Sequence, residues 1–390
     1  MGNNIPQGYK ATALGIIPQE WEVKKLGEVG KLLSGLTYTP SNIQSDGILV
    51  LRSSNIQNGV LAFDDNVYVN VSSYTPVKAG DILICVRNGS QNLIGKTALI
   101  TQEAEGCAFG AFMAVFRSSI SKYVFYLLGT ELYRKYIFRN LGATINSING
   151  SDLKKFRFPF PPLAEQRKIA EVLGVWDEAI EKLARLIEKL ALRKRALMQR
   201  LLSAKLRLPG FSEPWKEQKI NKITTIKKGE QVNKDVLFSN AKYPVINGGI
   251  TPSGYLDTYN TKANTITISE GGNSCGYVNF MTTPFWSGGH CYTIDAKDGI
   301  NNLFIYQLLK NNEKYIMSLR VGSGLPNIQI KNLGNIKFMI PTYQEQTAIA
   351  EVLTAADREI ELAKEKLERL RRQKRGLMQQ LLTGKKRINS

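Results

Sequence analysis

Residues 161–205 read PPLAEQRKIAEVLGVWDEAIEKLARLIEKLALRKRALMQRLLSAK, and residues 341–385 read PTYQEQTAIAEVLTAADREIELAKEKLERLRRQKRGLMQQLLTGK. The two stretches align without a gap at a constant offset of 180, and 21 of their 45 positions are identical. Ungapped identity over this length indicates that one structural unit occurs twice in the chain. The fold is therefore predicted to contain one structural unit twice, with each copy organised around one of these two segments.

In both copies the apolar side chains recur at alternating steps of four and three residues. This spacing is typical of the buried face of a coiled-coil helix, and about 40 helical residues span roughly 60 Å. Lys194 and Lys374 interrupt the apolar stripe at the same place, where a lysine either fixes the helix register or faces solvent. The residues predicted to pair the helices are Ile169, Leu173, Trp176, Ile180, Leu183, Ile187, Leu190, Leu197, Leu201, Ile349, Leu353, Ile360, Leu367, Leu370, Leu377 and Leu381.

Charge is distributed in the same way along both helices. Acidic side chains such as Glu165, Asp177 and Glu345 dominate the first half of each helix, and basic ones such as Arg193 and Arg372 dominate the second half. Each helix alone gains from this polarity, because its macrodipole favours acid first and base last. A parallel pair would still place like charges side by side, so antiparallel pairing is predicted.

Composition narrows the class of protein. The chain has 390 residues, enough for two or three domains, and 43% of them are hydrophobic. A formal net charge of +19 favours a polyanion such as DNA or RNA as partner over an anionic membrane. No run of 18 apolar residues suggests a membrane span, and the N-terminus MGNNIPQGYK lacks a signal-peptide pattern. The four cysteines are scattered, so a cytoplasmic location is expected.

Two globular stretches accompany the helices, and both are predicted to mix strands and helices. We expect strands at 47–51, 81–86, 97–100, 113–116 and 153–160 in the first, and at 243–246, 265–269, 291–294 and 336–341 in the second. Corresponding helices are expected at 122–138 and 303–319, corresponding loops at 142–150 and 322–330, and a loose segment at 1–13. The predicted fold class is therefore mixed α/β (α+β), with one plan used twice.

No motif for catalysis stands out. Residues 89–97, GSQNLIGKT, approach a phosphate-binding loop, but five residues separate the glycines and a strand is expected next, so a polar hairpin loop is the better interpretation. His290 is the one histidine, and with four dispersed cysteines it makes no metal site. A partly buried structural role is the better interpretation for His290. The chain is predicted to recognise and organise rather than to catalyse.

Several repeated motifs resemble the specificity subunits of type I restriction-modification systems. They are Pro-x-x-x-Glu-Gln at 161–166 and 341–346, Ile-Ala-Glu-Val-Leu, Leu-Met-Gln-x-Leu-Leu, and the lead-in turns with Trp21 and Trp215. The resemblance implies an N-terminal segment at 1–19, target recognition domains at 20–160 and 208–340, and spacer helices within 161–207 and 341–390. It implies two globular domains separated by two long antiparallel coiled-coil helices in a pseudo-twofold repeat.

The same resemblance implies a function. Such a subunit is not catalytic by itself and reads a bipartite DNA target, one half with each recognition domain. It binds two methyltransferase subunits, and the larger complex adds two restriction subunits. No cofactor is expected on this chain; S-adenosylmethionine, ATP and Mg are expected on the partner subunits. Two alternatives remain: a self-contained nuclease or ATPase, and a coiled-coil adaptor with no nucleic-acid role.

Base readout uses Arg, Lys, Asn and Gln side chains, and phosphate contacts use Lys, Arg and backbone amides. On this ground we select polar residues from the divergent interiors. In the first domain the predicted DNA-binding residues are Arg52, Ser53, Asn55, Arg87, Asn88, Gln91, Asn92 and Lys96. In the second domain they are Lys227, Lys228, Asn247, Glu270, Asn273, Ser274, His290 and Arg320.

Overall fold

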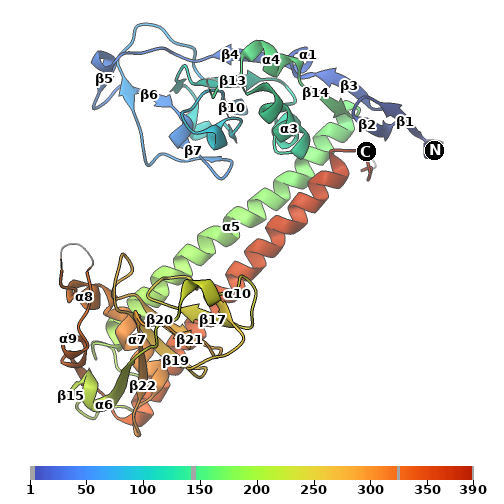
Figure 1. Cartoon of the computed structure of the whole chain (residues 1–390). Helices are drawn as coiled ribbons and strands as arrows, with labels where there is room; N and C mark the ends of the chain where they lie inside the picture. The colour runs from blue at the N-terminus through green and yellow to red at the C-terminus, as the bar shows by residue number, and fades with distance from the viewer. Residues whose placement is uncertain (1–4, 142–145, 323–325, 389–390) are drawn as a thin grey trace. The chain divides into compact units, whose positions relative to one another are not determined.

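The structure is a computed structural model that describes residues 5–141, 146–322 and 326–388. Its longest elements are the helices α5 (Leu163–Leu201) and α10 (Tyr343–Leu381), drawn in light green and red in Figure 1. The chain divides into a first unit, residues 1–182 and 367–390, and a second unit, residues 183–366. Each unit therefore contains one globular stretch, the first half of one long helix and the second half of the other.

Within each unit the two long helices are antiparallel. In the first unit Glu165 contacts Arg387 and Asp177 contacts Lys374. As the residue numbers increase along α5, the numbers of the partner residues on and after α10 decrease. In the second unit Lys194 contacts Asp357 and Arg207 contacts Glu345, so the partner numbers again run in opposite directions. The antiparallel pairing predicted from the charge distribution is confirmed.

The main sheet of the first unit has the strand order β11–β10–β13–β4, and all its pairs are antiparallel. The strands are β4 (Lys31–Ser34), β10 (Ile82–Cys85), β11 (Thr97–Leu99) and β13 (Met113–Arg117). The sequence ILIC makes β10 buried along its whole length, and helix α2 (Ser121–Leu127) contributes Tyr123 and Leu127 to the same core. A second sheet has the order β12–β6–β9–β5, where β5 is Ile43–Gln44 and β9 is Tyr68–Val69. It pairs β12 (Ala108–Phe109) in parallel with β6 (Ile48–Leu51).

The second unit repeats this topology with a different sequence. Its main sheet runs β20–β19–β22–β16, from β16 (Thr224–Lys228), β19 (Thr265–Ser269), β20 (Val278–Met281) and β22 (Cys291–Ala296). Its second sheet has the order β18–β17–β21, where β18 is Gly254–Leu256. It again contains a parallel pair, β17 (Tyr243–Ile246) with β21 (Trp286–Ser287). The prediction that one plan is used twice is confirmed.

Shorter elements join the sheets to the long helices. Strand β3 (Glu22–Lys25) pairs with β14 (Arg157–Phe160), and β15 (Lys216–Lys219) pairs with β23 (Lys337–Ile340). The remaining strands are β1 (Tyr9–Thr12), β2 (Gly15–Pro18), β7 (Ile56–Gln57) and β8 (Val60–Leu61). The remaining α-helices are α1 (Leu26–Val29), α3 (Glu131–Asn140), α4 (Gly150–Lys155), α6 (Ile220–Ile223), α7 (Asn302–Asn311), α8 (Glu313–Ser318) and α9 (Ile330–Gly334).

Three local predictions are wrong. The helix expected at 122–138 is interrupted after Leu127, because Thr130 caps the start of α3 by accepting a hydrogen bond from the Tyr133 backbone amide. The helix expected at 303–319 is likewise divided into α7 and α8, at Asn312. Residues 153–155 belong to helix α4, so the closing strand begins only at Arg157.

The N-terminal segment also differs from its prediction. Residues 9–12 are not loose but form a hairpin with Gly15–Pro18, and the Tyr9 hydroxyl donates to the backbone carbonyl of Gly384 at 3.0 Å. Within the predicted loops 142–150 and 322–330, residues 142–145 and 323–325 lie outside the described residues. Over the described ranges, no helix is long and apolar enough to cross a membrane.

Candidate nucleic-acid interface

Two loops of the first unit meet at the end of strand β10. One is the 86–96 loop between β10 and β11, and the other includes residues 146–148. The Asn88 amide donates to the Asn146 carbonyl at 3.2 Å, and the Ile148 amide donates to the Val86 carbonyl at 2.9 Å. The Asn146 side chain adds a bond to the Gly89 carbonyl at 3.0 Å. The two loops therefore form one connected polar surface.

The structure brings most of the first set of predicted residues to this surface. Arg87, Gln91, Asn92 and Lys96 all come from the 86–96 loop and are exposed. Asn88 Nδ2 donates to Ser53 Oγ at 2.9 Å, which ties the turn at 53–55 to the loop. These side chains combine positive charge with amide groups, the mixture that base and phosphate contacts require.

Two residues of the 52–55 turn use their side chains for contacts inside the protein. The Arg52 guanidinium is half-buried and pairs with Asp65 at 2.9 Å. Asn55 is fully buried: its Oδ1 accepts from the Arg52 amide, and its Nδ2 donates to the Ala62 carbonyl, both at 2.9 Å. Asn55 was predicted to contact DNA, but in this structure its buried side chain holds the turn together. Asparagine suits such turns for the same reason that it suits base readout, namely its paired donor and acceptor.

The second unit joins the corresponding loops. The loop 270–277 between β19 and β20 lies beside residues 326–328, through bonds from the Ile328 amide to the Glu270 carbonyl (2.8 Å) and from the Gly272 amide to the Pro326 carbonyl (3.1 Å). Ile148 and Ile328 are 180 residues apart, which is the offset of the repeat. The predicted residues Lys227, Asn273 and Arg320 are exposed, and the half-buried Ser274 donates to the Gly248 carbonyl.

Glu270 is the centre of a polar cluster in the second unit. Its carboxylate accepts hydrogen bonds from Lys228 Nζ at 2.6 Å and from the Tyr292 hydroxyl at 3.0 Å, and it lies 3.3 Å from His290 Nδ1. Burial acts to raise the pKa of Glu270, but the hydrogen bonds and the charge of Lys228 outweigh it, so the pKa is lowered from its ordinary value. Glu270 is therefore an ionised acceptor whose oxygens are already engaged.

His290 differs from the expectation of a partly buried structural residue. Its side chain is 61% exposed. The backbone amide of His290 donates to Asn247 Oδ1 at 3.0 Å, so Asn247 supports the turn that carries the imidazole. Of these two predicted residues, His290 presents its ring to solvent, while the Asn247 side-chain oxygen is engaged inside the protein.

Phe112 is an exposed residue of this region that the sequence analysis missed. It precedes strand β13, and 54% of its surface is exposed. The Arg87 guanidinium lies over its ring, 5.7 Å from the centroid. Within the apolar stretch 112–116 (FMAVF) nothing in the sequence separates Phe112 from its buried neighbours. Only the turn that precedes the strand exposes it.

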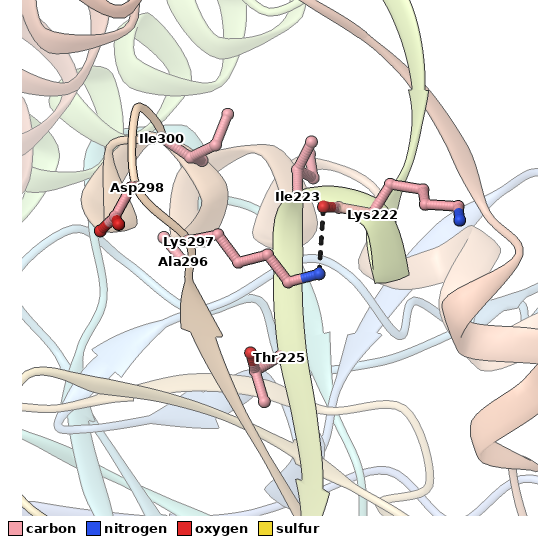
Figure 2. Close-up of a pocket in the computed structure, with 7 residues that line it drawn as sticks. All are labelled: Lys222, Ile223, Thr225, Ala296, Lys297, Asp298 and Ile300. Atoms are coloured by element: carbon pink, nitrogen blue, oxygen red, sulfur yellow. Dashed lines mark hydrogen bonds between the residues drawn. The ribbon is translucent and has the colours of Figure 1, made fainter.

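Two other features carry no sign of catalysis. The 89–97 stretch connects two antiparallel strands through the short 3₁₀ turn Gln91–Leu93, without the helix that follows a phosphate-binding loop. The second unit also contains a pocket of about 520 Å³. Figure 2 shows residues that line it, with the hydrogen bond from Lys297 Nζ to the Lys222 carbonyl oxygen at 3.1 Å. Lys297 Nζ also donates to the carbonyl oxygen of Asn221 at 3.1 Å. None of the predicted DNA-binding residues lines that pocket. Among the described residues, no three His, Cys, Asp or Glu side chains group as metal ligands.

The repeated Glu-Gln motif anchors each globular stretch to its long helix. The buried Glu165 accepts from Trp21 Nε1 at 3.0 Å and pairs with Arg387 at 2.7 Å. Glu345 makes the corresponding bonds, with Trp215 Nε1 at 3.0 Å and Arg207 at 2.6 Å. The neighbouring glutamines, Gln166 and Gln346, donate to the carbonyl oxygens of Pro161 and Pro341. The lead-in tryptophans are thus structural anchors.

The apolar stripe of the helices faces inward. All the residues predicted to pair the helices are buried or half-buried, whereas Val175 and Leu186 on the outer face are exposed. The ends of the stripe also enter the globular cores: Ile169, Leu173 and Leu381 join the core of the first unit, and Leu201, Ile349 and Leu353 that of the second. Lys194 and Lys374 are half-buried and each contacts an aspartate at 2.5 Å, so they do not open the stripe to solvent.

Comparison with known proteins agrees with this architecture. The family model described as the type I restriction modification DNA specificity domain matches residues 18–191 and 212–372. A protein of Methanocaldococcus jannaschii, provisionally named the specificity subunit of type I restriction enzyme MjaX, is 27% identical over 98% of both chains. The EcoKI specificity subunit of Escherichia coli is 33% identical over 41% of this chain and 36% of its own.

Among solved structures, the type I restriction-modification S subunit of M. genitalium has the same fold, with a TM-score of 0.67 and 21% identity over 98% of this chain and 97% of its own. The family model covers most of the chain and matches it twice, once for each copy of the repeat. The chain therefore belongs to the family of type I restriction-modification DNA specificity subunits.

Proposed function

We propose that this chain is the non-catalytic subunit that gives a type I restriction-modification complex its DNA sequence specificity. Each unit reads one half of a bipartite target with its joined pair of loops. The observation that carries this proposal is that both units present the same two loops on the same sheet, with different exposed side chains. A shared scaffold with divergent loops suits two different half-sites.

The predicted residues that remain free to contact DNA have distinct roles in this proposal. Arg87, Gln91, Asn92 and Asn273 are the candidates for base readout, because their exposed side chains carry the donors and acceptors that base edges match. Lys96, Lys227 and Arg320 are the candidates for phosphate contacts, which position the protein and make binding salt-dependent. Lys228 is engaged with the Glu270 carboxylate and belongs to the support of the loop. Arg52, Ser53, Asn88, Asn247, Glu270 and Ser274 support these loops through their bonds inside the protein.

In this proposal the long helices set the spacing between the half-sites. Each helix contributes one half to each unit, so its length constrains the separation of the two loop surfaces. The exposed apolar residues Val175 and Leu186 on α5 are candidates for contact with methyltransferase subunits. Val172 is less available, since it packs against the core of the first unit.

The partner subunits supply the chemistry in this proposal. Two methyltransferase subunits bind S-adenosylmethionine and two restriction subunits use ATP and Mg. No group on this chain takes part in those reactions. The proposal is consistent with the name of a solved relative of similar fold, which concerns complex assembly and conformational transition of the type I system.

A methylation map of the host genome tests the proposal directly. We expect one bipartite motif to be methylated when this chain is present and to lose methylation when its gene is deleted. Restoring the gene must restore the same motif. An unchanged methylation map after deletion would contradict the proposal.

Two measurements on purified protein separate the alternatives. Turnover of DNA or ATP by the chain without partners would support a self-contained enzyme. Binding that persists at high salt without sequence preference would support a coiled-coil adaptor, because contacts to phosphates weaken steeply as salt rises.

A further inference from the structure

Each unit carries one tight turn at the same point of its fold. In the first unit the turn is residues 110–113, closed by a bond from the Met113 amide to the Gly110 carbonyl at 2.8 Å. In the second it is residues 288–291, closed by a bond from the Cys291 amide to the Gly288 carbonyl at 3.0 Å. Each turn follows the strand of the parallel pair and leads into the next strand of the main sheet. The two turns are therefore structurally equivalent.

The third residue of each turn holds the loop that we propose contacts DNA. The Phe112 carbonyl accepts hydrogen bonds from the amides of Val86 (3.0 Å) and Arg87 (3.1 Å). The His290 carbonyl accepts one from the Glu270 amide at 2.9 Å. Phe112 and His290 thus occupy the same place relative to the loops, and both are exposed: residue Phe112 by 54% and the side chain of His290 by 61%.

Close backbone packing fixes both turns. A Cβ at Gly35 would lie 2.1 Å from the Gly110 carbonyl oxygen, and one at Gly229 would lie 2.4 Å from the Gly288 carbonyl oxygen. Only glycine, which has no Cβ, allows the backbone at positions 35 and 229 to pass this close to the turn. The backbone of the turn is therefore constrained in both units, while its third side chain differs in chemistry.

Each exposed ring also has a charged neighbour from the adjacent loop. In the first unit Arg87 lies over the Phe112 ring, 5.7 Å from its centroid. In the second unit the Glu270 carboxylate lies 3.3 Å from His290 Nδ1. A carboxylate accepts but does not donate, so the tautomer that bonds Glu270 carries its proton on Nδ1 and leaves Nε2 as an acceptor.

We propose that Phe112 and His290 are equivalent specificity-determining residues, one for each half of the DNA target. Phe112 contacts the 5-methyl group of a thymine, and Arg87 beside it donates to a neighbouring guanine. His290 accepts a hydrogen bond through Nε2 from the exocyclic amino group of an adenine or cytosine. This inference rests on the proposed function and names the side chains that distinguish one DNA base from another.

Phe112→Ala and His290→Ala, each in the assembled complex with the methyltransferase subunits, test the assignment. We expect the Phe112→Ala methylation map to tolerate other bases at one position of one half-site, with the other half-site unchanged. His290→Ala must relax the opposite half-site. Phe138→Ala and Tyr315→Ala remove exposed aromatic rings on α3 and α8 and serve as controls that leave both half-sites intact.

Base analogues test the chemistry of each contact. Uracil in place of the thymines of the first half-site should weaken binding of the wild-type complex about tenfold and should not weaken binding of Phe112→Ala further. Adenine and cytosine analogues without the exocyclic amino group serve the same purpose for His290. Equal losses for wild type and variant would overturn the contact.

The outcomes separate this inference from the proposed function. A wild-type complex that methylates no bipartite motif contradicts the proposed function itself. A wild-type complex with a clear motif, and variants that keep both half-sites and their thermal stability, overturns only the assignment of Phe112 and His290. Hydrogen exchange of each variant checks that the loops remain folded.

Discussion

At the scale of single residues, the side chains that most need a partner are the buried glutamates. Glu165 and Glu345 are almost fully buried, and each is neutralised by an arginine from the segment that follows the other long helix. A buried carboxylate is costly unless it is paired and hydrogen-bonded. The Arg387 pair raises the pKa of that guanidinium, chiefly through the hydrogen bond to Glu165. In the first unit the bonds of Arg387 therefore fasten the chain after α10 to the start of α5.

The first prediction concerns these bonds. Arg387→Ala should lower the free energy of unfolding of the first unit by about 3 kcal/mol, because it leaves the Glu165 carboxylate buried without its cation. Urea unfolding followed by tryptophan fluorescence measures the loss, and hydrogen exchange of β3 localises it. Adding Glu165→Gln should recover part of the stability. Lys385→Ala, at an exposed lysine nearby, is the control and should change little.

The second prediction concerns the glycine crossing at Gly35. Gly35→Ala should destabilise the protein by about 1–3 kcal/mol, the usual cost of overpacking, because the new Cβ meets the Gly110 carbonyl. The φ angle of Gly35 is outside the left-handed region, so the cost is steric rather than conformational. Gly89→Ala, where a Cβ meets nothing within 4 Å, should stay within about 0.5 kcal/mol of wild type in the same unfolding experiment. Equal stability of the two variants would contradict the explanation.

At the scale of elements, the two lysines within the apolar stripe define how α5 and α10 pair. Lys194 contacts Asp357, and one repeat further Lys374 contacts Asp177, both at 2.5 Å. The aspartates are supported in turn by Gln307 and Tyr126, each at 2.8 Å. A slip of one heptad would place Lys194 opposite Ala350 or Lys364 instead of Asp357. A polar residue in a coiled-coil seam commonly specifies register in this way.

The third prediction is a coupling energy between these partners. A double-mutant cycle with Lys194→Ala and Asp357→Ala should give about 1 kcal/mol, because the lysine is only 13% exposed. The same cycle on Lys182 and Glu178, an exposed pair within α5, should give about 0.3–0.5 kcal/mol. Thermal or urea unfolding of the single and double variants supplies the values. A coupling no greater than that of the exposed pair would argue against a role in register.

At the scale of the whole molecule, the repeat makes one scaffold serve two recognition surfaces. Each unit completes its core with the beginning of one long helix and the end of the other. Neither globular stretch is therefore independent of the helices. In the proposed function, changing the helix length should alter the spacing of the half-sites and leave their sequences unaltered.

The fourth prediction tests this consequence. A heptad added within 182–188 of α5 and another within 362–368 of α10 preserves the apolar stripe and lengthens each helix by about 10 Å. At about 3.4 Å per base pair, the gap should grow by about three base pairs, or fewer if the helices are inclined to the DNA. The methylation map reads out both the gap and the half-sites. Finding the original gap would refute the spacing role.

Much of the architecture was predictable from sequence because it rests on periodic patterns. The 4–3 spacing indicated the two helices, the charge distribution indicated their antiparallel pairing, and buried strands such as Ile82–Cys85 were readable from short apolar runs. The divisions after Leu127 and at Asn312 were missed because a capping residue, Thr130 or Asn312, can divide a helix that an apolar stripe would continue. The repeated lysines were noticed, but their aspartate partners lie far away in sequence.

The sequence by itself determined the duplicated scaffold, because helix periodicity and identity at a fixed offset are local properties of the chain. Only the tertiary structure decided which polar residues are available to DNA. It buried Asn55, engaged Asn247 and Glu270 inside the protein, and exposed His290 and the apolar Phe112 at equivalent turns. The reason is physical: a side chain's availability depends on hydrogen bonds and packing between segments distant in sequence, which residue type alone does not encode.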